Sequence, residues 1–217
     1  MKKFRYIAFM LFGALVALTA FTSCSESSDD TENDFDDWQN RNETYYNNVY
    51  REAENAVKSG SEDWKIISKW SIDDNVATPT DRIVVKVLQK GTGTESPLFT
   101  DYVKVFYRGR LIPSVNYPQG YVFDQSYTTP ELNPETSAAS IFNVPKLVDG
   151  FATAVQHMHV GDHWLVYIPY QLGYGTVKSG SVPAFSTLIF DVYLHSFSQV
   201  DDGKAWHAKQ SVYLTEE

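Results

Sequence analysis

Few residue sets in this chain have the types and spacing that covalent chemistry requires. There is no Gly-x-Ser-x-Gly elbow, and the single cysteine, Cys24, lies near the N-terminus, so the usual hydrolase nucleophiles are missing. His157, His159 and His163 cluster in sequence, but they have no cysteine and no convincing fourth ligand beside them. We therefore expect no metal and no cofactor. The Gly91-x-Gly93 pair lacks the rest of a dinucleotide loop and indicates a turn.

Aromatic residues and one acid are more informative. Asp124 follows Phe123 in an aromatic stretch, where a core offers no reason for a carboxylate, and capping of a turn is the structural alternative. Tyr174 stands between two glycines, which indicates a loop aromatic, and such residues serve binding more often than packing. A pocket of this composition would bind an apolar group and place a few hydrogen bonds around it.

The N-terminus has the three parts of a secretory signal. Lys2, Lys3 and Arg5 are followed by an apolar run over residues 7–21 and by small residues up to Cys24. The apolar run is short for a membrane-spanning helix, which needs about 20 residues. A lone cysteine at this place resembles the lipobox of bacterial lipoproteins, although position 21 is phenylalanine where leucine is usual. We therefore expect a signal peptide over residues 1–23 and a lipid anchor on Cys24; an ordinary cleaved signal peptide is the alternative.

The residues that follow carry mostly negative charge. Residues 24–33 are acidic and polar, cannot bury enough surface to fold, and predict a flexible tether. The whole chain has 18 basic and 27 acidic residues, and loss of the three basic signal residues leaves a net charge of −12. No basic stripe is present to neutralise phosphates, so we expect no nucleic-acid partner. Membrane attachment must then come from the lipid, at the cell envelope and, we expect, on the outer membrane.

Hydrophobic spacing predicts the elements that must position the candidate residues. Apolar residues recur at threes and fours over residues 34–59, which indicates a helix; the sequence leaves open whether this helix also pairs two chains. Residues 64–79 predict a connector with one short strand. From residue 81 the period becomes two, with strands near 82–89, 102–109, 162–168 and 187–196, and 145–158 is the one helical stripe in this half. One short helix on one face of an antiparallel sheet is an α+β architecture.

Read in order, this half resembles the FKBP-type peptidyl-prolyl cis/trans isomerase family. The family pattern V-x-Y-x-G-x-L is met at residues 105–111, and the F-D-S block at 123–126. The V-I-x-G-W block is met at 147–151, and M-x-x-G at 158–161. The I-P and Y-G blocks are met at 168–169 and 173–175, and the I-P-x-x-(S/T)-L-x-F-D-V-x-L ending at 182–194. Seven ordered blocks between residues 82 and 198 form a specific signal, and the first 80 residues lie outside it.

The resemblance implies a twisted antiparallel sheet wrapped around one short helix, preceded here by an N-terminal helix. It implies isomerisation of X-Pro bonds in exported polypeptides, by desolvating and hydrogen-bonding the twisted amide. It implies catalytic roles for Tyr107, Asp124 and Tyr174, with Phe151 as the floor and Val182 closing the rim. It assigns substrate binding to six residues: Phe123, Leu147, Val148, Phe151, Val182 and Phe190. Each apolar member would also be expected in a core without any ligand.

The chain departs from the family pattern at several places. Phe151 replaces a more usual tryptophan, and Ser140 stands where an aromatic often flanks the pocket, which would open one wall. Residues 112–122 and 128–140 form longer connections, and either could border the pocket. A non-catalytic polypeptide-binding or chaperone module is therefore the alternative function, and a β-rich ligand receptor is a weaker third. The expected domain boundaries are 1–23, 24–33, a helical appendage and connector over 34–80, the isomerase domain over 81–199, and a tail over 200–217.

Overall fold

The structure is a computed structural model that describes residues 34–198 and 207–208. The expected signal peptide, the lipidation site Cys24, the acidic tether and nearly all of the C-terminal tail lie outside these residues. The described helices are α2 (Trp38–Lys58) and α3 (Asp149–His157), with 3-10 turns η1 (Pro79–Asp81), η2 (Val144–Lys146) and η3 (Tyr170–Leu172). Within this range no helix combines the length and apolar character needed to cross a membrane.

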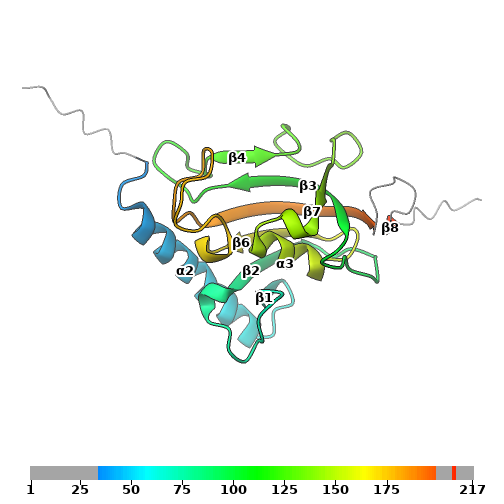
Figure 1. Ribbon diagram of the computed structural model, residues 1–217, viewed down its shortest axis with the longest axis horizontal. Helices are drawn as coiled ribbons and strands as arrows, with labels where there is room; N and C mark the ends of the chain where they lie inside the picture. Colours follow the sequence, from blue (N-terminus) through cyan, green and yellow to red (C-terminus); the bar gives the residue numbers. More distant parts are fainter. Residues whose placement is uncertain (1–33, 199–206, 209–217) are drawn as a thin grey trace, which may run out of the picture. The chain divides into compact units, whose positions relative to one another are not determined.

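An eight-stranded antiparallel sheet forms the centre of the molecule (Figure 1). Its main path runs β1-β2-β6-β7-β3-β4, while β5 pairs with β3 and β8 pairs with β7. The strands are β1 (Trp64–Ser68), β2 (Arg82–Gln89), β3 (Tyr102–Arg110), β4 (Val122–Gln125), β5 (Ser140–Asn143), β6 (His163–Ile168), β7 (Leu188–Ser198) and β8 (His207–Ala208). The predicted α+β architecture, a twisted antiparallel sheet around one short helix, is confirmed.

Helix α3 covers one face of this sheet because alternate strand residues point toward it. Ile83 and Val85 of β2 and Leu194 of β7 are fully buried in the core cluster that also contains Val155 of α3. Met158, at the end of α3, closes the same core. The alternate apolar residues of the strands therefore pack against the apolar side of α3, as their spacing predicts.

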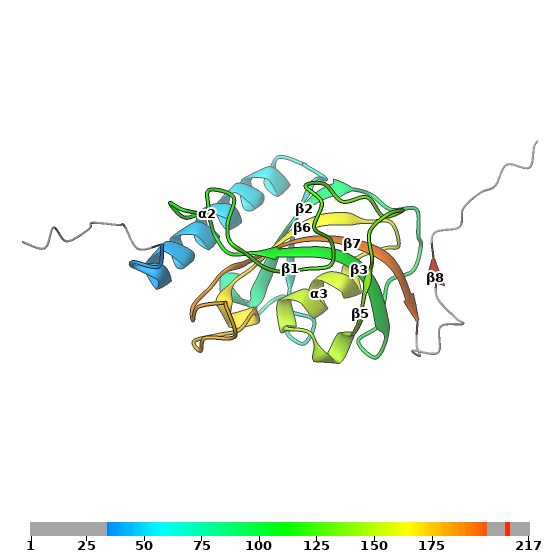
Figure 2. The ribbon, with the colours of Figure 1, turned by 90° about the horizontal axis from the view of Figure 1, so that it is seen from above.

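Helix α2 packs on its own domain and covers the other face of the sheet at the β1–β2–β6 end (Figure 2). Val84 points away from α3 and is fully buried against Tyr46 and Ala53 of α2. The Tyr46 hydroxyl donates to the carbonyls of Pro79 (3.1 Å) and Arg82 (2.6 Å). The expectation of a sheet with one buried side is therefore wrong at this end, where a second helical layer buries the other face.

The expected boundary at residue 81 does not separate two packing units. Strand β1 pairs with β2 along its whole length, from Trp64 opposite Lys86 to Ser68 opposite Arg82. The described residues from Asp34 onward group as one compact unit by their backbone contacts. Residues 34–80, expected as an appendage and connector, thus supply an outer helix and an edge strand to the same sheet.

Candidate functional site

Strands β3 and β7 place two aromatic rings on the face that α3 covers. Tyr107 and Phe190 lie on adjacent strands, in a register where Gly109 is opposite Phe190. A Cβ on Gly109 would lie 2.5 Å from Cζ of Phe123 and 2.7 Å from Cε1 of Phe190. Glycine is required at position 109 because the rings of Phe123 and Phe190 occupy the space that a side chain would fill. Without a side chain there, these two rings can pack directly on β3.

Helix α3 carries the ring that lies at the bottom of the pocket. Gly150 lets the helix approach β6 closely, since a Cβ there would lie 2.3 Å from Cγ2 of Ile168. The next residue, Phe151, is 3% exposed and meets Phe190 edge to face, with ring centroids 4.8 Å apart. The Tyr107 ring also meets the Phe151 ring edge to face, with ring centroids 6.2 Å apart. The helix and two strands thus form a rigid aromatic floor.

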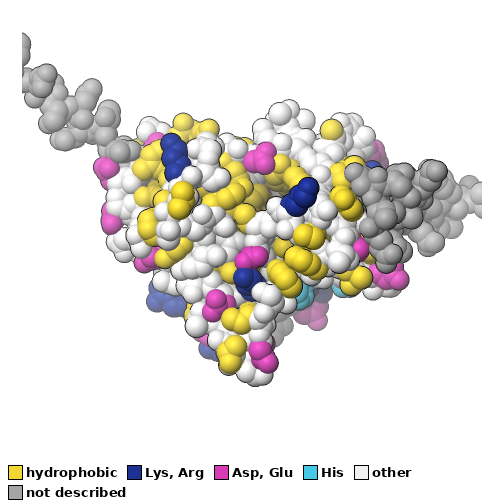
Figure 3. Space-filling view, viewed as in Figure 1, with side chains coloured by type: hydrophobic (Ala, Val, Ile, Leu, Met, Phe, Trp, Pro, Cys, Tyr) yellow, Lys and Arg dark blue, Asp and Glu magenta, His cyan; other side chains and the backbone are white. Residues whose placement is uncertain are grey.

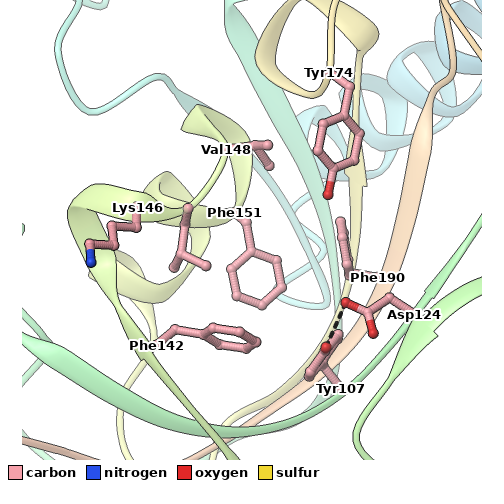
Figure 4. A pocket seen from close by; sticks show the side chains of 9 residues that line it. Tyr107, Asp124, Phe142, Lys146, Val148, Phe151, Tyr174 and Phe190 are labelled. Atoms are coloured by element: carbon pink, nitrogen blue, oxygen red, sulfur yellow. Dashed lines mark hydrogen bonds between the residues drawn. The ribbon is translucent and has the colours of Figure 1, made fainter. Parts of the chain in front are cut away.

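These rings form the floor of an open pocket, which we call the aromatic pocket (Figure 4). Its cavity volume is about 210 Å³. Nine residues line it: Tyr107, Asp124, Phe142, Lys146, Leu147, Val148, Phe151, Tyr174 and Phe190. Most of this lining is apolar, and the polar atoms are few.

The polar groups of the pocket gather at one side. The Tyr107 hydroxyl donates to Oδ2 of Asp124 at 2.7 Å, which joins β3 to β4 across the rim. Burial raises the pKa of Tyr107, and the neighbouring Asp124 carboxylate raises it further. The hydroxyl therefore stays protonated and remains a donor throughout the physiological range.

Tyr174 approaches the pocket from a loop that follows η3. Its ring is 40% exposed, and its hydroxyl points into the pocket from the side opposite Phe142 (Figure 4). The Gly175 amide donates to the carbonyl of Tyr170 at 2.8 Å, which folds the loop back toward η3. Burial and the Asp124 carboxylate both raise the pKa of Tyr174, so its hydroxyl is also held as a donor.

Helix α2 fixes the loop that carries Tyr174. The loop, residues 173–187, returns to β7 through Ser186 and Thr187, and the Trp38 indole donates to the Ser186 hydroxyl at 2.9 Å. The Asn42 side-chain oxygen accepts from the Thr187 amide at 2.8 Å, and its amide nitrogen donates to the Trp38 carbonyl at 2.7 Å. Asn42 is fully buried, so this contact belongs to the core and not to the surface.

Seven of the nine predicted site residues come together in the pocket. Phe123 stands one layer behind the lining, where its ring packs edge to face on Phe190 at 5.4 Å. Val182 is 3% exposed, belongs to the core cluster and is not among the lining residues of the pocket, so its role at the rim stays a prediction. The loop folds its side chain inward, where apolar surface is removed from water.

Two lining residues, Phe142 and Lys146, were missed. Phe142 comes from β5 and meets the Tyr107 ring at 5.4 Å. It supplies an aromatic wall near Ser140, which the sequence suggested would be open. The signal for Phe142 was its place in the short stretch before Pro145, but a four-residue strand has too little period to show which side faces a pocket. Lys146 gave no signal, because a lysine in a turn is usually only solvated.

The two longer connections contribute no lining residue to the aromatic pocket. The first, residues 112–122, lies against the start of α2, where Arg41 donates to the Pro113 carbonyl at 3.2 Å and the Asn116 amide donates to Asp34 at 3.0 Å. The second, residues 128–140, is held at its start by Arg108. That guanidinium is nearly buried and donates to the carbonyls of Thr129 and Pro130.

Lys and Arg side chains are scattered singly over the face shown in Figure 3 and form no basic stripe there. The three histidines of the sequence cluster have separate contacts. His157 Nδ1 bonds the Thr153 carbonyl, His163 pairs with Asp191, and His159 lies beside Asp162. No group of three metal-ligating side chains occurs within the described residues.

Comparison with known proteins gives consistent results. Residues 93–195 match the sequence model of a family described as FKBP-type peptidyl-prolyl cis-trans isomerase. The chain is 31% identical over 208 residues to the macrophage infectivity potentiator of Trypanosoma cruzi, covering 95% of this chain and 89% of that protein. It is 37% identical over 110 residues to the FKBP-type 22 kDa peptidyl-prolyl cis-trans isomerase of Escherichia coli, covering 50% of this chain and 47% of that protein.

Two further similarities concern location and fold. The chain is 32% identical over 112 residues to the outer membrane protein MIP of Legionella longbeachae, covering 51% of this chain and 42% of that protein. The chain thus spans less than half the length of these two bacterial relatives. The crystal structure of FkpA from Escherichia coli superposes with a TM-score of 0.53 at 24% identity, over 76% of this chain and 62% of that one. This structure supports the fold alone.

Proposed function

The chain belongs to the FKBP-type peptidyl-prolyl cis-trans isomerases, and we propose that its aromatic pocket accelerates rotation about X-Pro bonds in exported polypeptides. One observation carries the proposal. The Phe151 ring, the Tyr107–Asp124 pair and the Tyr174 hydroxyl come from four separate parts of the fold and converge on one apolar hollow. A fold that needed these residues only for packing would have no reason to hold two hydroxyls and a carboxylate at its open mouth.

The reaction requires no nucleophile and no metal. Rotation about the C–N bond breaks amide resonance, which costs about 18–20 kcal/mol and takes tens to hundreds of seconds without a catalyst. The planar amide is polarised and well solvated, whereas the twisted amide is less so. A dry apolar pocket therefore disfavours the ground state relative to the transition state, and preorganised donors add selective stabilisation.

The geometry suggests how the residues share this work. The proline ring would rest on Phe151, between Phe142 and Phe190, where apolar contact holds it while the amide turns. Tyr174 would donate its hydroxyl to the substrate carbonyl next to proline. Asp124 would fix the Tyr107 hydroxyl and set the electrostatic field at the mouth of the pocket. The site would then favour one twisted geometry of the substrate amide.

We place this activity outside the cytoplasm, on a lipid anchor at Cys24. The support is the basic, apolar and small-residue order of the first 24 residues. A relative that carries the name of an outer membrane protein is consistent with an envelope location. Proline-containing polypeptides that pass through the envelope would then be the substrates.

A peptide assay tests the proposal directly. Cis and trans populations of a short X-Pro peptide can be followed by NMR exchange, together with a refolding reaction limited by proline isomerisation. We expect micromolar protein to accelerate both, Asp124→Ala to reduce the acceleration about tenfold, and Asp36→Ala, an exposed acid outside the pocket, to leave it unchanged. If the intact protein accelerated neither reaction, the proposal would be wrong and the alternative of a polypeptide-binding module would stand.

A further inference from the structure

The aromatic pocket continues into a second hollow that the proposed reaction does not use. This hollow, which we call the flanking groove, is lined by Tyr102, Ile141, Phe142, Asn143, Lys146 and Leu147. Three of these residues, Phe142, Lys146 and Leu147, also line the aromatic pocket. A polypeptide whose proline sat on Phe151 would therefore meet the flanking groove as it left the pocket.

The groove has the surface of a binding site for an extended chain. Ile141 is 45% exposed, although it is a large aliphatic residue in a strand. The side-chain oxygen of Asn143 is buried and accepts no hydrogen bond from any residue between 34 and 198. Strand β5 pairs with β3 on one side only, so its outer edge keeps backbone groups free for an added chain.

Lys146 is the cation shared by the pocket and the groove. Its side chain points away from the aromatic floor, and its ammonium lies on the side opposite Asp124 and Tyr174 (Figure 4). In the described part of the chain no carboxylate forms a salt bridge with it. Lys146 is exposed, and an acidic side chain beside the proline of a substrate could form an ion pair with its ammonium. The protein as a whole carries a net negative charge, so a lysine at the pocket has the opposite sign to most of its charged residues.

We propose that the flanking groove binds the substrate residues next to proline and that Lys146 selects substrates with an acidic side chain there. The inference rests on the proposed isomerase function and names its substrate class. Lys146 acts here as a specificity-determining residue. Ile141 would hold the apolar part of the same segment, and the outer edge of β5 would hold its backbone.

Isomerisation of a peptide series tests the role of Lys146. Glu, Gln and Lys are placed in turn at each of the two positions before and the two positions after proline, and kcat/KM is measured by NMR exchange. At one position we expect Glu to be favoured over Gln about two- to fivefold, the range of an exposed ion pair. The ratio should fall to about one in Lys146→Gln, invert in Lys146→Glu, and fade at high salt.

Matched variants separate the groove from general effects. Lys58→Gln makes the same charge change on α2, at a side chain that is 68% exposed, and should keep the Glu/Gln ratio. Ile141→Ser should lower kcat/KM for long peptides and not for short ones that end at the pocket. Leu88→Ser, at a strand residue with a similar exposure of 47%, should change neither.

The outcomes distinguish this inference from the function on which it rests. Acceleration of neutral peptides without a Glu preference at any position, or a preference that survives Lys146→Gln, would overturn the role of Lys146 alone. Acceleration of no peptide at all would overturn the proposed function. Binding to the flanking groove would then be measured by the fluorescence anisotropy of the same peptides carrying a fluorophore. Equal affinity for the Glu and Gln peptides would overturn the role of Lys146 as well.

Discussion

Tyr107 and Asp124 form a contact between two strands that serves the pocket more than the fold. The pair lies at the open mouth, and the carboxylate is exposed on its outer side, so the fold would lose little without it. The contribution of this hydrogen bond should therefore appear in the rate of isomerisation. A hydrogen bond to a charged group contributes about 1.5–3 kcal/mol, which corresponds to roughly ten- to a hundredfold in rate if it acts only on the transition state.

A double-mutant cycle tests this coupling. We expect Tyr107→Phe and Asp124→Ala each to lower kcat/KM about tenfold or more, and the double variant to lose less than the product of the two. The control is Tyr193→Phe, which removes a half-buried hydroxyl on the opposite face of β7 and should leave kcat/KM unchanged. Independent, multiplicative effects of the two substitutions would show that the hydrogen bond has no catalytic role.

Buried tyrosines predict the response to alkali. Burial raises the pKa of Tyr46 and Tyr107, and it raises the pKa of Tyr167 to about 12. A tyrosine with a raised pKa favours the folded state below its ordinary value of about 10, and this contribution is lost as the pH rises through the folded-state value. The free energy of unfolding should therefore hold up to about pH 10 and fall above it.

Tyrosinate absorbance measures this behaviour. Exposed tyrosines should titrate near pH 10 in the folded protein, while the buried ones should titrate only at higher pH or on unfolding. Tyr167→Phe should flatten the loss of stability above pH 10, by at most about 1.4 kcal/mol per pH unit for one proton. Simultaneous titration of all 14 tyrosines of the chain in the folded state would contradict the prediction.

At the scale of elements, α2 acts on the site through the loop of residues 173–187. The loop carries Tyr174 at one end and ends at Thr187, whose amide is bonded to the buried Asn42 side chain. The Thr187 hydroxyl also donates to the Asn42 carbonyl at 3.2 Å. A helix on the outer face of the sheet therefore fixes the C-terminal end of a loop whose N-terminal end reaches the pocket on the other face.

Asn42→Ala tests this connection. The substitution leaves the buried Thr187 amide without an acceptor, so we expect a loss of about 1–3 kcal/mol in the free energy of unfolding, measured by urea denaturation. KM for peptides should rise as well, because Tyr174 is then less well placed. Asn47→Ala, at an exposed position on the same helix, should cost less than about 0.5 kcal/mol. Equal effects of the two variants would show that α2 does not support the loop.

At the scale of the whole molecule, three layers are built from one chain. Helix α2 lies on one face of the sheet, α3 lies on the other, and β1 adds residues 64–68 to the edge of the same sheet. The pocket is lined by residues of α3 and β4. Helix α2 lies on the other side of the sheet from α3 (Figure 2).

Cell fractionation tests the anchor at this scale. Cys24→Ser removes the only sulfur that could carry a lipid, so the protein should move from the membrane fraction to the soluble envelope fraction. Labelling with a radioactive fatty acid should be lost in the same variant. Isomerase activity should be unchanged, because the pocket lies within residues 107–190. An unchanged membrane fraction would show that attachment has another cause.

From the sequence we could predict the family, the alternating strands and, through the family resemblance, seven of the residues that meet in the pocket. These follow from local information, since strand period, helix stripe and ordered motifs are all written in short segments. The tertiary structure alone decided that Val84 is covered by α2, that Val182 belongs to the core, and that Phe142 and Lys146 border the pocket. Each of these depends on which segments far apart in the chain lie side by side. The pairing of β5 with β3 and the packing of α2 on the sheet bring distant segments together. No short-range pattern in the sequence encodes either of these two contacts.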